Sequence, residues 1–200
     1  MKRILTGITP SGYPHLGNYI GAIKPSLDLL DEKCESFLFI ADLHAVIKVS
    51  DPSRLTELSN AIAIAWLASG LDPNKTCFYR QSDVPEITEL AWLLSCITEK
   101  GLLNRAHAYK AAVDQNSESG KKEMDEGISL GLFSYPLLMA SDILTPNATH
   151  VPVGKDQQQH LEITRDIAEK FNNKYGKFFN IPEAVIQNEK TVLGLSLIHI

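Results

Sequence analysis

Three stretches of the sequence combine polar residues with glycines in ways that could hold a charged ligand. The first, TPSGYPHLGN (Thr9–Asn18), separates a short apolar run from a helical pattern, so backbone N–H groups would meet the positive end of a helix. Glycines at 12, 17 and 21 would let a nucleotide or the preceding strand approach closely, and His15 could donate to a phosphate oxygen. The alternative is a plain glycine–proline turn, which glycine content alone favours. The stretch matches neither the GxGxxG pattern of dinucleotide-binding proteins nor the P-loop pattern.

The second stretch, THVPVGKDQQQH (Thr149–His160), is a strand pattern that ends at Gly154 and leads into a helix. Gly154 would permit close approach of a ligand, Asp156 could accept a hydrogen bond from a ribose hydroxyl, and Gln157 offers an amide. Taken alone, an acidic residue at the start of a helix more often has a capping role.

The third stretch, LFSYPLLMASDIL, places Asp142 in apolar surroundings. A buried carboxylate without a partner is costly, so we expect one: a backbone N–H, a lysine, or an N–H group of a ligand. Tyr135 and Met139 precede Asp142 by seven and three residues and therefore share its helical face. An aromatic ring, a thioether and a carboxylate would suit an indole ring, and core packing is the alternative.

Other features of the composition limit the class of function. His44 follows a strand pattern together with Asp42, but no Ser–His–Asp order and no metal-ligand spacing is evident. The three cysteines are widely spaced, which predicts reduced thiols in a cytoplasmic protein. The net charge of -5 does not exclude a local basic patch for RNA. No apolar run approaches the roughly 20 residues of a membrane span.

Strand and helix patterns alternate along the chain, which predicts one α/β domain with a doubly wound parallel sheet. We expect ligands to bind beyond the carboxyl ends of the strands, where the strand order reverses. A polar stretch without periodicity, residues 111–127, predicts a mobile loop. The expected strands are 3–7, 36–42, 75–81, 149–154 and 191–195. The expected helices are 16–30 with an interruption at Pro25, 51–70, 86–100, 128–144 and 156–176.

The motifs PSGYPHLGNYIGA, YPLLMASDIL and VPVGKDQQQHLEITRDIAEKFN, in this order and spacing, resemble bacterial tryptophanyl-tRNA synthetases. PHLGN resembles the "HIGH" signature of class I synthetases, with Asn18 in place of the last histidine. The resemblance implies a Rossmann-like catalytic domain over residues 1–195, with a mainly helical insertion at roughly 85–130. Residues 196–200 look like an atypical tail. A lysine-rich catalytic loop and a helical anticodon-binding domain, which the family has, are expected to be absent.

The resemblance also implies a two-step reaction. The carboxylate of tryptophan attacks the α-phosphorus of ATP, and the aminoacyl group then passes to the terminal ribose of tRNA(Trp). ATP is a substrate and would bring Mg²⁺ with it, so no metal site in the protein itself is expected. The resemblance also implies a homodimer that does not contact a membrane. Residues implied to assist catalysis are His15, Asn18 and Lys110. Implied ATP contacts are Thr9, Pro10, Ser11, Gly17, Asn18, Gly154, Lys155, Asp156 and Val192. Implied tryptophan contacts are Gly7, His44, Tyr135, Met139, Asp142, Val153 and Gln157, with Asp142 accepting from the indole N–H.

Two alternative functions stay open at this point. One is a non-catalytic chain that binds tryptophan or ATP, or that partners a full-length subunit. The other is a nucleotidyltransferase that shares the HxGN turn and adenylates something other than an amino acid.

Overall fold

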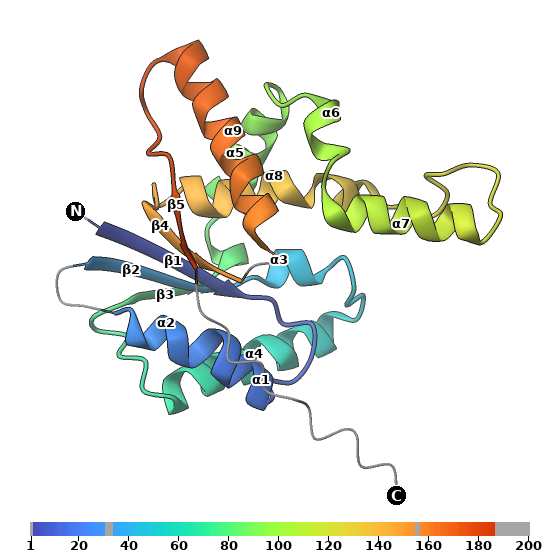
Figure 1. Cartoon of the computed structure of the whole chain (residues 1–200). Helices are drawn as coiled ribbons and strands as arrows, with labels where there is room; N and C mark the ends of the chain where they lie inside the picture. Colours follow the sequence, from blue (N-terminus) through green and yellow to red (C-terminus); the bar gives the residue numbers. More distant parts are fainter. Residues whose placement is uncertain (1, 31–33, 155–156, 187–200) are drawn as a thin grey trace, which may run out of the picture.

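A computed structural model describes residues 2–30, 34–154 and 157–186 of the chain. Within these residues, five parallel strands form one sheet in the order β3-β2-β1-β4-β5 (Figure 1). This confirms the predicted α/β fold with a doubly wound parallel sheet, and the strand order reverses between β1 and β4. The strands are β1 (Lys2–Ile8), β2 (Cys34–Ile40), β3 (Cys77–Arg80), β4 (His150–Val153) and β5 (Glu183–Ile186).

The two neighbours of β1 pair with it over very different lengths. β2 pairs with β1 along the whole strand, from Lys2↔Cys34 to Ile8↔Ile40. β4 forms one paired position with β1, Ile4↔His150, in the part of the chain that the structure describes. β1 and β4 therefore separate toward their carboxyl ends, at the point where the strand order reverses.

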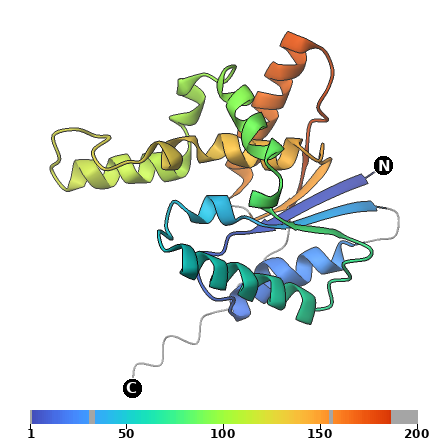
Figure 2. The ribbon, with the colours of Figure 1, turned by 180° about the vertical axis from the view of Figure 1, so that it is seen from behind.

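One face of the sheet is covered by the N-terminal helical segment and by α4 (Pro52–Ala68), as both ribbon views show (Figures 1 and 2). The N-terminal segment consists of α1 (Leu16–Asn18), the π-helical turn η1 (Tyr19–Ile23) and α2 (Lys24–Asp28). The core on this side contains Trp66 and Ile62 of α4 against Ile8 and Leu38 of the sheet.

The predicted interruption at Pro25 takes the form of the π-helical turn η1. The N–H of Lys24 bonds to the carbonyl of Tyr19, five residues earlier. Proline lacks an N–H and its ring collides with the carbonyl four residues before it in a regular α-helix. The wider π turn removes this conflict, so the helix continues past Pro25 with its apolar face still toward the sheet.

The other face is covered by helices packed around α8 (Leu130–Leu144), which contains Pro136. Ile143 of α8 packs on the sheet, whereas Leu137 and Leu144 pack against the surrounding helices. α8 is therefore buried on both sides and carries residues to the centre of the fold. The other elements in this region are η2 (Gln81–Asp83), α3 (Asp42–Ala45), α5 (Glu86–Ser95), α6 (Lys100–Leu103), α7 (His107–Glu118) and α9 (Gln158–Tyr175).

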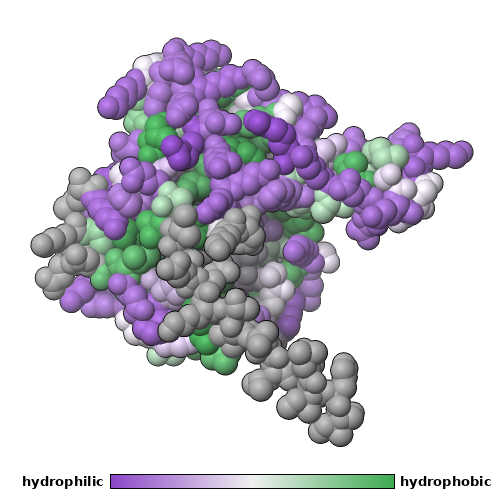
Figure 3. Space-filling view, viewed as in Figure 1, coloured by the Kyte–Doolittle hydropathy of each residue, from purple (hydrophilic) through white to green (hydrophobic). Residues whose placement is uncertain are grey.

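The prediction of a loop over residues 111–127 is wrong for its first half, because α7 extends to Glu118. Two tertiary contacts hold this helix: the ring of Tyr109 packs edge-to-face on Phe133, and the amide of Asn116 donates to two carbonyls of the returning segment. A search for helical periodicity in the sequence cannot predict these contacts, because they join different segments of the chain. α7 projects as an arm on the side where the strands end, and hydrophilic side chains cover much of this region (Figures 1 and 3).

Three other expectations concerned helix and strand limits. The helix expected over 86–100 ends at Ser95, and α6 follows as a separate turn. α9 ends as predicted at Gly176, whose φ of 96° suits glycine. β5 was not expected from the sequence. The strand expected at 191–195 lies outside the described residues.

Candidate active site

A cavity of about 640 Å³ opens where β1 and β4 separate. Its wall reaches both faces of the sheet, because successive residues of a strand point to opposite sides. Leu5 packs with Ile143 of α8, whereas Ile8 packs with Ile23 and Trp66 on the other face. We call the two parts the α8-side lobe and the α2-side lobe. The α8-side lobe includes Leu5, Gly7, Phe39, His44, Tyr135, Met139, Asp142 and Val153, and the α2-side lobe includes Thr6, Gly21, Ala22, Ser26 and Pro152.

Asp142 is the charged centre of the α8-side lobe and is only 1% exposed. One of its carboxylate oxygens lies 2.8 Å from Nε2 of His44, and the other accepts from Nε2 of Gln81 at 2.7 Å. The sequence predicted a partner but suggested a backbone N–H, a lysine or a ligand; the protein partners are a histidine and a glutamine. Burial raises the pKa of Asp142, and the contacts with His44 and Gln81 act in the opposite direction. Because a carboxylate has about four acceptor positions, a ligand N–H can be added.

Gln81 connects this carboxylate to a second buried acid, Asp42. The side-chain oxygen of Gln81 accepts from the N–H of Leu43 at 3.1 Å, and the same N–H contacts Asp42. Asp42 also accepts from the N–H and the hydroxyl of Ser82, at 3.0 Å and 2.5 Å. The end of β3 thus fixes both the turn that carries His44 and the orientation of Asp142. The sequence analysis predicts ligand binding beyond the carboxyl ends of the strands but does not single out Gln81.

Tyr135 stands beside Asp142 on α8 and is held by a residue that the sequence analysis also missed. Its hydroxyl lies 3.0 Å from Nε2 of His160, on the first turns of α9. The ring of Tyr135 meets His44 and His160 edge-on, with ring centroids 6.5 Å and 5.2 Å apart. Burial raises the pKa of Tyr135, so its phenol stays protonated and can donate a hydrogen bond. Met139 completes this apolar wall, as the spacing on α8 predicted.

The loop between β1 and α1 borders the opposite end of the cavity. Thr9 and Ser11 line it, and His15 and Asn18 form a reciprocal cap at the start of α1. Nδ1 of His15 accepts from the N–H of Gly17 at 3.1 Å, so in the neutral ring the proton is on Nε2. His15 is exposed, and this Nε2–H group is a donor that its own cap leaves available.

Tyr13 attaches the middle of this loop to α4. Its hydroxyl donates to Glu57, and its ring lies under the guanidinium of Arg54, 4.4 Å from the ring centroid. Arg54 in turn bonds to Glu57 at 2.7 Å. The tether is exposed, so its contribution to stability is small, but it restricts where Thr9 and Ser11 can lie.

The glycines around the cavity differ in whether neighbouring atoms would collide with a side chain at their position. A side chain at Gly7 would overlap the ring of Phe39, so this position must stay small for β1 and β2 to pair. A Cβ at Gly17 would lie 2.9 Å from the ring of His15 in the cap. At Gly12 and Gly21 a Cβ would meet no atom of the described residues within 4 Å, so none of these residues requires glycine there. Gly21 lines the cavity, where an added methyl group would occupy ligand space.

All seven predicted tryptophan contacts and three of the predicted ATP contacts line one cavity. Lys110 lies on α7, is exposed and is not part of the cavity wall, whereas Lys48 is. Pro10 is buried beside the wall. Predicted positions 155, 156 and 192 lie outside the described residues. Those that line the cavity are Gly7, Thr9, Ser11, His44, Tyr135, Met139, Asp142, Val153, Gly154 and Gln157.

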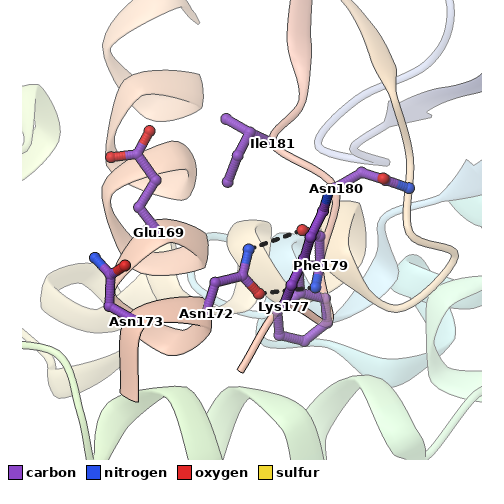
Figure 4. A pocket seen from close by; sticks show the side chains of 7 residues that line it. All are labelled: Glu169, Asn172, Asn173, Lys177, Phe179, Asn180 and Ile181. Carbon is purple, nitrogen blue, oxygen red and sulfur yellow. Dashed lines mark hydrogen bonds between the residues drawn. The ribbon is translucent and has the colours of Figure 1, made fainter. Parts of the chain in front are cut away.

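A second cavity, of about 490 Å³, lies at the end of α9 (Figure 4). Its central polar side chain, Asn172, is fully engaged by the chain: it accepts from the N–H groups of Phe178 and Phe179 and donates to the carbonyl of Phe179. We interpret these hydrogen bonds as a structural contact that holds the segment after Gly176 against α9.

Among the residues that the structure describes, no group of three or more His, Cys, Asp or Glu side chains is arranged to hold a metal ion. In the same part of the chain, every helix is too short or too polar to cross a membrane.

The sequence profile of the family described as tRNA synthetases class I (W and Y) matches residues 1–196. The chain belongs to this family. This class I synthetase chain is 58% identical over 193 residues to a tryptophan–tRNA ligase of Bordetella pertussis, covering 96% of the chain and 43% of the relative. It is 54% identical to the ligase of Neisseria meningitidis, covering 97% of the chain and 58% of the relative.

Solved structures agree with the sequence relatives. The tryptophanyl-tRNA synthetase of Campylobacter jejuni, solved in complex with ADP and tryptophan, matches the synthetase chain with a TM-score of 0.82 and 49% identity. The match covers 94% of the chain and 56% of that protein. The chain thus spans about half the length of the relatives it matches.

Proposed function

We propose that the chain carries the site at which L-tryptophan is activated by ATP in a tryptophan–tRNA ligase. The observation that supports this most is the buried Asp142 carboxylate, oriented by His44 and Gln81, in a cavity beside Tyr135 and Met139. Such an acceptor favours an indole over ring systems without an N–H, because an unpaired buried carboxylate is costly. The identity to tryptophan–tRNA ligases over nearly the whole chain supports the same assignment.

In the proposed first step, the carboxylate oxygen of tryptophan attacks the α-phosphorus of ATP. A mixed anhydride, tryptophanyl-adenylate, forms as the bond to pyrophosphate breaks. The reactants provide the nucleophile and the leaving group, so the protein acts by positioning and by stabilising charge on the phosphates. Donors available for this lie in the loop after β1: the hydroxyls of Thr9 and Ser11, and Nε2–H of His15.

In the proposed second step, the terminal ribose hydroxyl of tRNA(Trp) attacks the carbonyl of the adenylate and releases AMP. Mg²⁺ would be held mainly by phosphate oxygens, because the described residues offer no acidic cluster for it. Asn18, Lys110, Gly154, Lys155, Asp156 and Val192 are proposed to contact ATP. A homodimer in the cytoplasm is proposed from the family resemblance.

A second candidate is a chain that binds tryptophan and ATP without turnover. The position of Lys110 favours it: this proposed phosphate contact lies on the exposed arm, outside the cavity wall.

The test is to titrate the 200-residue chain calorimetrically with L-tryptophan, L-tyrosine and ATP, and to measure tryptophan-dependent exchange of pyrophosphate into ATP. Activation predicts binding of tryptophan over tyrosine, together with exchange. Binding of both substrates without exchange would favour the second candidate. If tryptophan fails to bind, both are wrong.

A further inference from the structure

The outer rim of the cavity carries a lysine, Lys48, that is not among the residues implied by the sequence. Among the described residues that line the cavity, it is the one lysine or arginine. In that same set the one acid is Asp142, which is buried and already bonded to His44 and Gln81. The fixed positive charge of the described wall is therefore located at Lys48.

The turn at the end of α3 places Lys48 on the same side as His44. The N–H groups of Lys48 and Val49 both bond to the carbonyl of Ala45, at 2.9 Å and 2.8 Å, so the chain makes one further helical turn after α3. Residues four positions apart on such a turn share a face, and both His44 and Lys48 line the cavity. His44 is half-buried beside Asp142, whereas Lys48 is exposed. Lys48 therefore stands one turn farther out, where the cavity opens.

Three helix ends meet at this rim. Ile47 and Lys48 follow α3, Ala108 lies in the first turn of α7, and Leu132 lies in the first turn of α8; all four line the cavity. A Cβ at Gly131 would lie 3.7 Å from the side chain of Ile47, so the end of α3 packs beside the start of α8. Neither α7 nor α8 has an acidic residue in its first turn. These helix ends therefore bring no carboxylate to the rim.

Lys48 forms no ion pair with another described residue. In the same part of the chain, Lys24, Lys121 and Lys170 each pair with a carboxylate, at 2.8 Å, 3.8 Å and 2.7 Å, and none of them lines the cavity. Other lysines, such as Lys75, are unpaired and exposed, as is common on a protein surface. Its position in the cavity wall, rather than the lack of a partner alone, distinguishes Lys48.

We propose that Lys48 is a catalytic residue that binds the β- and γ-phosphates of ATP and stabilises pyrophosphate as it leaves. The proposal rests on the proposed function and identifies a cation for it within the cavity wall. When the carboxylate oxygen of tryptophan bonds to the α-phosphorus, the bond from that phosphorus to the bridging oxygen breaks, and its electron pair stays on pyrophosphate. Negative charge therefore grows on the leaving group and is lost from the carboxylate. A cation at the leaving group stabilises the transition state more than the bound reactants.

Neighbouring strand ends bring Lys48 and the loop after β1 to the same edge of the sheet. Ile8 pairs with Ile40 at the ends of β1 and β2, and the N–H of Ala41 bonds to the carbonyl of Ile8 at 2.9 Å. The loop that carries Ser11 and the turn that leads to Lys48 therefore start side by side. A triphosphate held by the loop would extend past α3 toward the rim. Bound ATP displaces water from the cavity, which strengthens its attraction to the ammonium group.

The experiment compares Lys48→Met, Lys48→Arg and Lys75→Met with the parent chain. Methionine removes the charge and keeps an unbranched side chain, whereas arginine keeps the charge. Lys75 is a matched control because it is exposed and precedes β3, at the edge of the sheet opposite the cavity. Calorimetry measures the binding of ATP, AMP, L-tryptophan and tryptamine, which lacks the carboxylate. The thermal midpoint and pyrophosphate exchange are measured for each variant.

For Lys48→Met we expect ATP to bind roughly three- to tenfold more weakly, as for the loss of one exposed charged contact. AMP lacks the β- and γ-phosphates and should bind as it does to the parent. The loss for ATP should shrink at high ionic strength, because salt screens an exposed charge. Lys48→Arg should keep most of the ATP affinity. Tryptophan and tryptamine binding and the thermal midpoint should not change, and Lys75→Met should match the parent throughout.

Exchange of pyrophosphate separates catalysis from binding. In a parent chain that shows exchange, Lys48→Met should lower the rate at saturating ATP and tryptophan, because the charge that Lys48 stabilises is largest as the bond breaks. An unchanged rate at saturation would reduce Lys48 to a binding residue and overturn the catalytic role.

The proposal is overturned if Lys48→Met binds ATP as the parent does, which would indicate a solvated surface lysine. It is also overturned if ATP and AMP weaken equally, if Lys48→Arg is as weak as Lys48→Met, or if tryptophan weakens while tryptamine does not. The last result would place Lys48 at the tryptophan carboxylate. In each of these cases, tryptophan and ATP binding by the parent leaves the proposed function standing. A parent chain that binds neither substrate overturns both proposals.

Discussion

The two lobes of the cavity differ in how far the protein satisfies its own polar groups. In the α8-side lobe, Asp142 has two protein partners, and Tyr135 is bonded to His160. In the α2-side lobe, the hydroxyls of Ser26 and Thr6 have none among the described residues. The polar groups of the first lobe are thus oriented by the chain itself, whereas two buried hydroxyls of the second lobe are not. Substitutions should therefore affect the two lobes in opposite ways: polar losses should disturb the α8 side and spare stability on the α2 side.

The largest effect should come from Asp142→Ala. Removing the acceptor leaves His44 and Gln81 without their shared partner and takes away the proposed bond to the indole. We expect tryptophan affinity to fall about 10- to 100-fold, as for a hydrogen bond to a charged group, with ATP affinity nearly unchanged. Calorimetry of both ligands is the measurement, and Asp114→Ala on the exposed arm is the control. Unchanged tryptophan affinity would show that the α8-side lobe is wrongly assigned.

Gly7→Ala and Gly21→Ala form a matched pair at the boundary between the lobes. The methyl group at position 7 would overlap Phe39, so we expect a loss of about 1–3 kcal/mol in the free energy of unfolding. At position 21 the space is open, so alanine should raise stability by up to about 1 kcal/mol while narrowing the α2-side lobe and weakening ATP binding. Urea unfolding measures both. Equal destabilisation would mean that the α2-side lobe is not open.

Gln81→Met tests whether the α8-side lobe depends on its network rather than on its shape. The substitution keeps the volume and removes the N–H that fixes Asp142. We expect preference for tryptophan over its benzothiophene analogue, which has no N–H, to fall roughly three- to tenfold. Gln115→Met, on the exposed arm formed by α7 and outside the cavity wall, provides a control of the same residue type. A uniform loss of affinity for both ligands would indicate a packing role for Gln81.

The smallest effect is a pH dependence of stability. The pKa of Asp142 is higher in the folded state than in the unfolded state, mainly because burial disfavours the charged carboxylate. The charge of nearby Asp42 raises this pKa further, whereas the contacts with His44 and Gln81 lower it. Stability from the protonated carboxyl is thus present below the ordinary pKa, about 3.9, and is lost as pH rises through the raised folded value. Asp142→Asn should remove this decline. Urea midpoints of parent and variant between about pH 4 and about pH 8 should converge toward the acid end; parallel curves would contradict the prediction.

The fold was predictable because the apolar runs of β1 and β2 alternate with helical patterns, whereas β5 was not expected from the sequence. The sequence also predicted that ligands bind where the strand order reverses, but it did not predict that β1 and β4 are the strands that separate there. The spacing of Tyr135, Met139 and Asp142 predicted that they share one helical face, and all three line the same cavity. Their contact with tryptophan stays a prediction.

What could not be predicted depends on contacts between distant segments. Gln81 reaches Asp142 across 61 residues, and no local pattern marks a glutamine after a strand as a hydrogen-bond partner. Likewise, no local pattern marks His160 as a partner of Tyr135. The helical structure of α7 was not predicted either, because its packing on Phe133 through Tyr109 is a contact between distant segments. The unpartnered hydroxyl of Ser26 is invisible in the sequence, because an amphipathic helix can place a serine anywhere on its face.

The long reach of β4 back to β1 has a consequence for the order in which the chain folds. Strands β1, β2 and β3 are complete by Arg80, whereas the hydrogen bond from the N–H of Arg3 to Oγ1 of Thr149 joins residues 146 positions apart. Contacts of such high sequence separation form late, because a long loop must close before they contribute. The half-sheet with its α4 layer can therefore assemble early during synthesis. The cavity, whose wall combines residues of β1 with residues of α8 and β4, is then among the last features to appear.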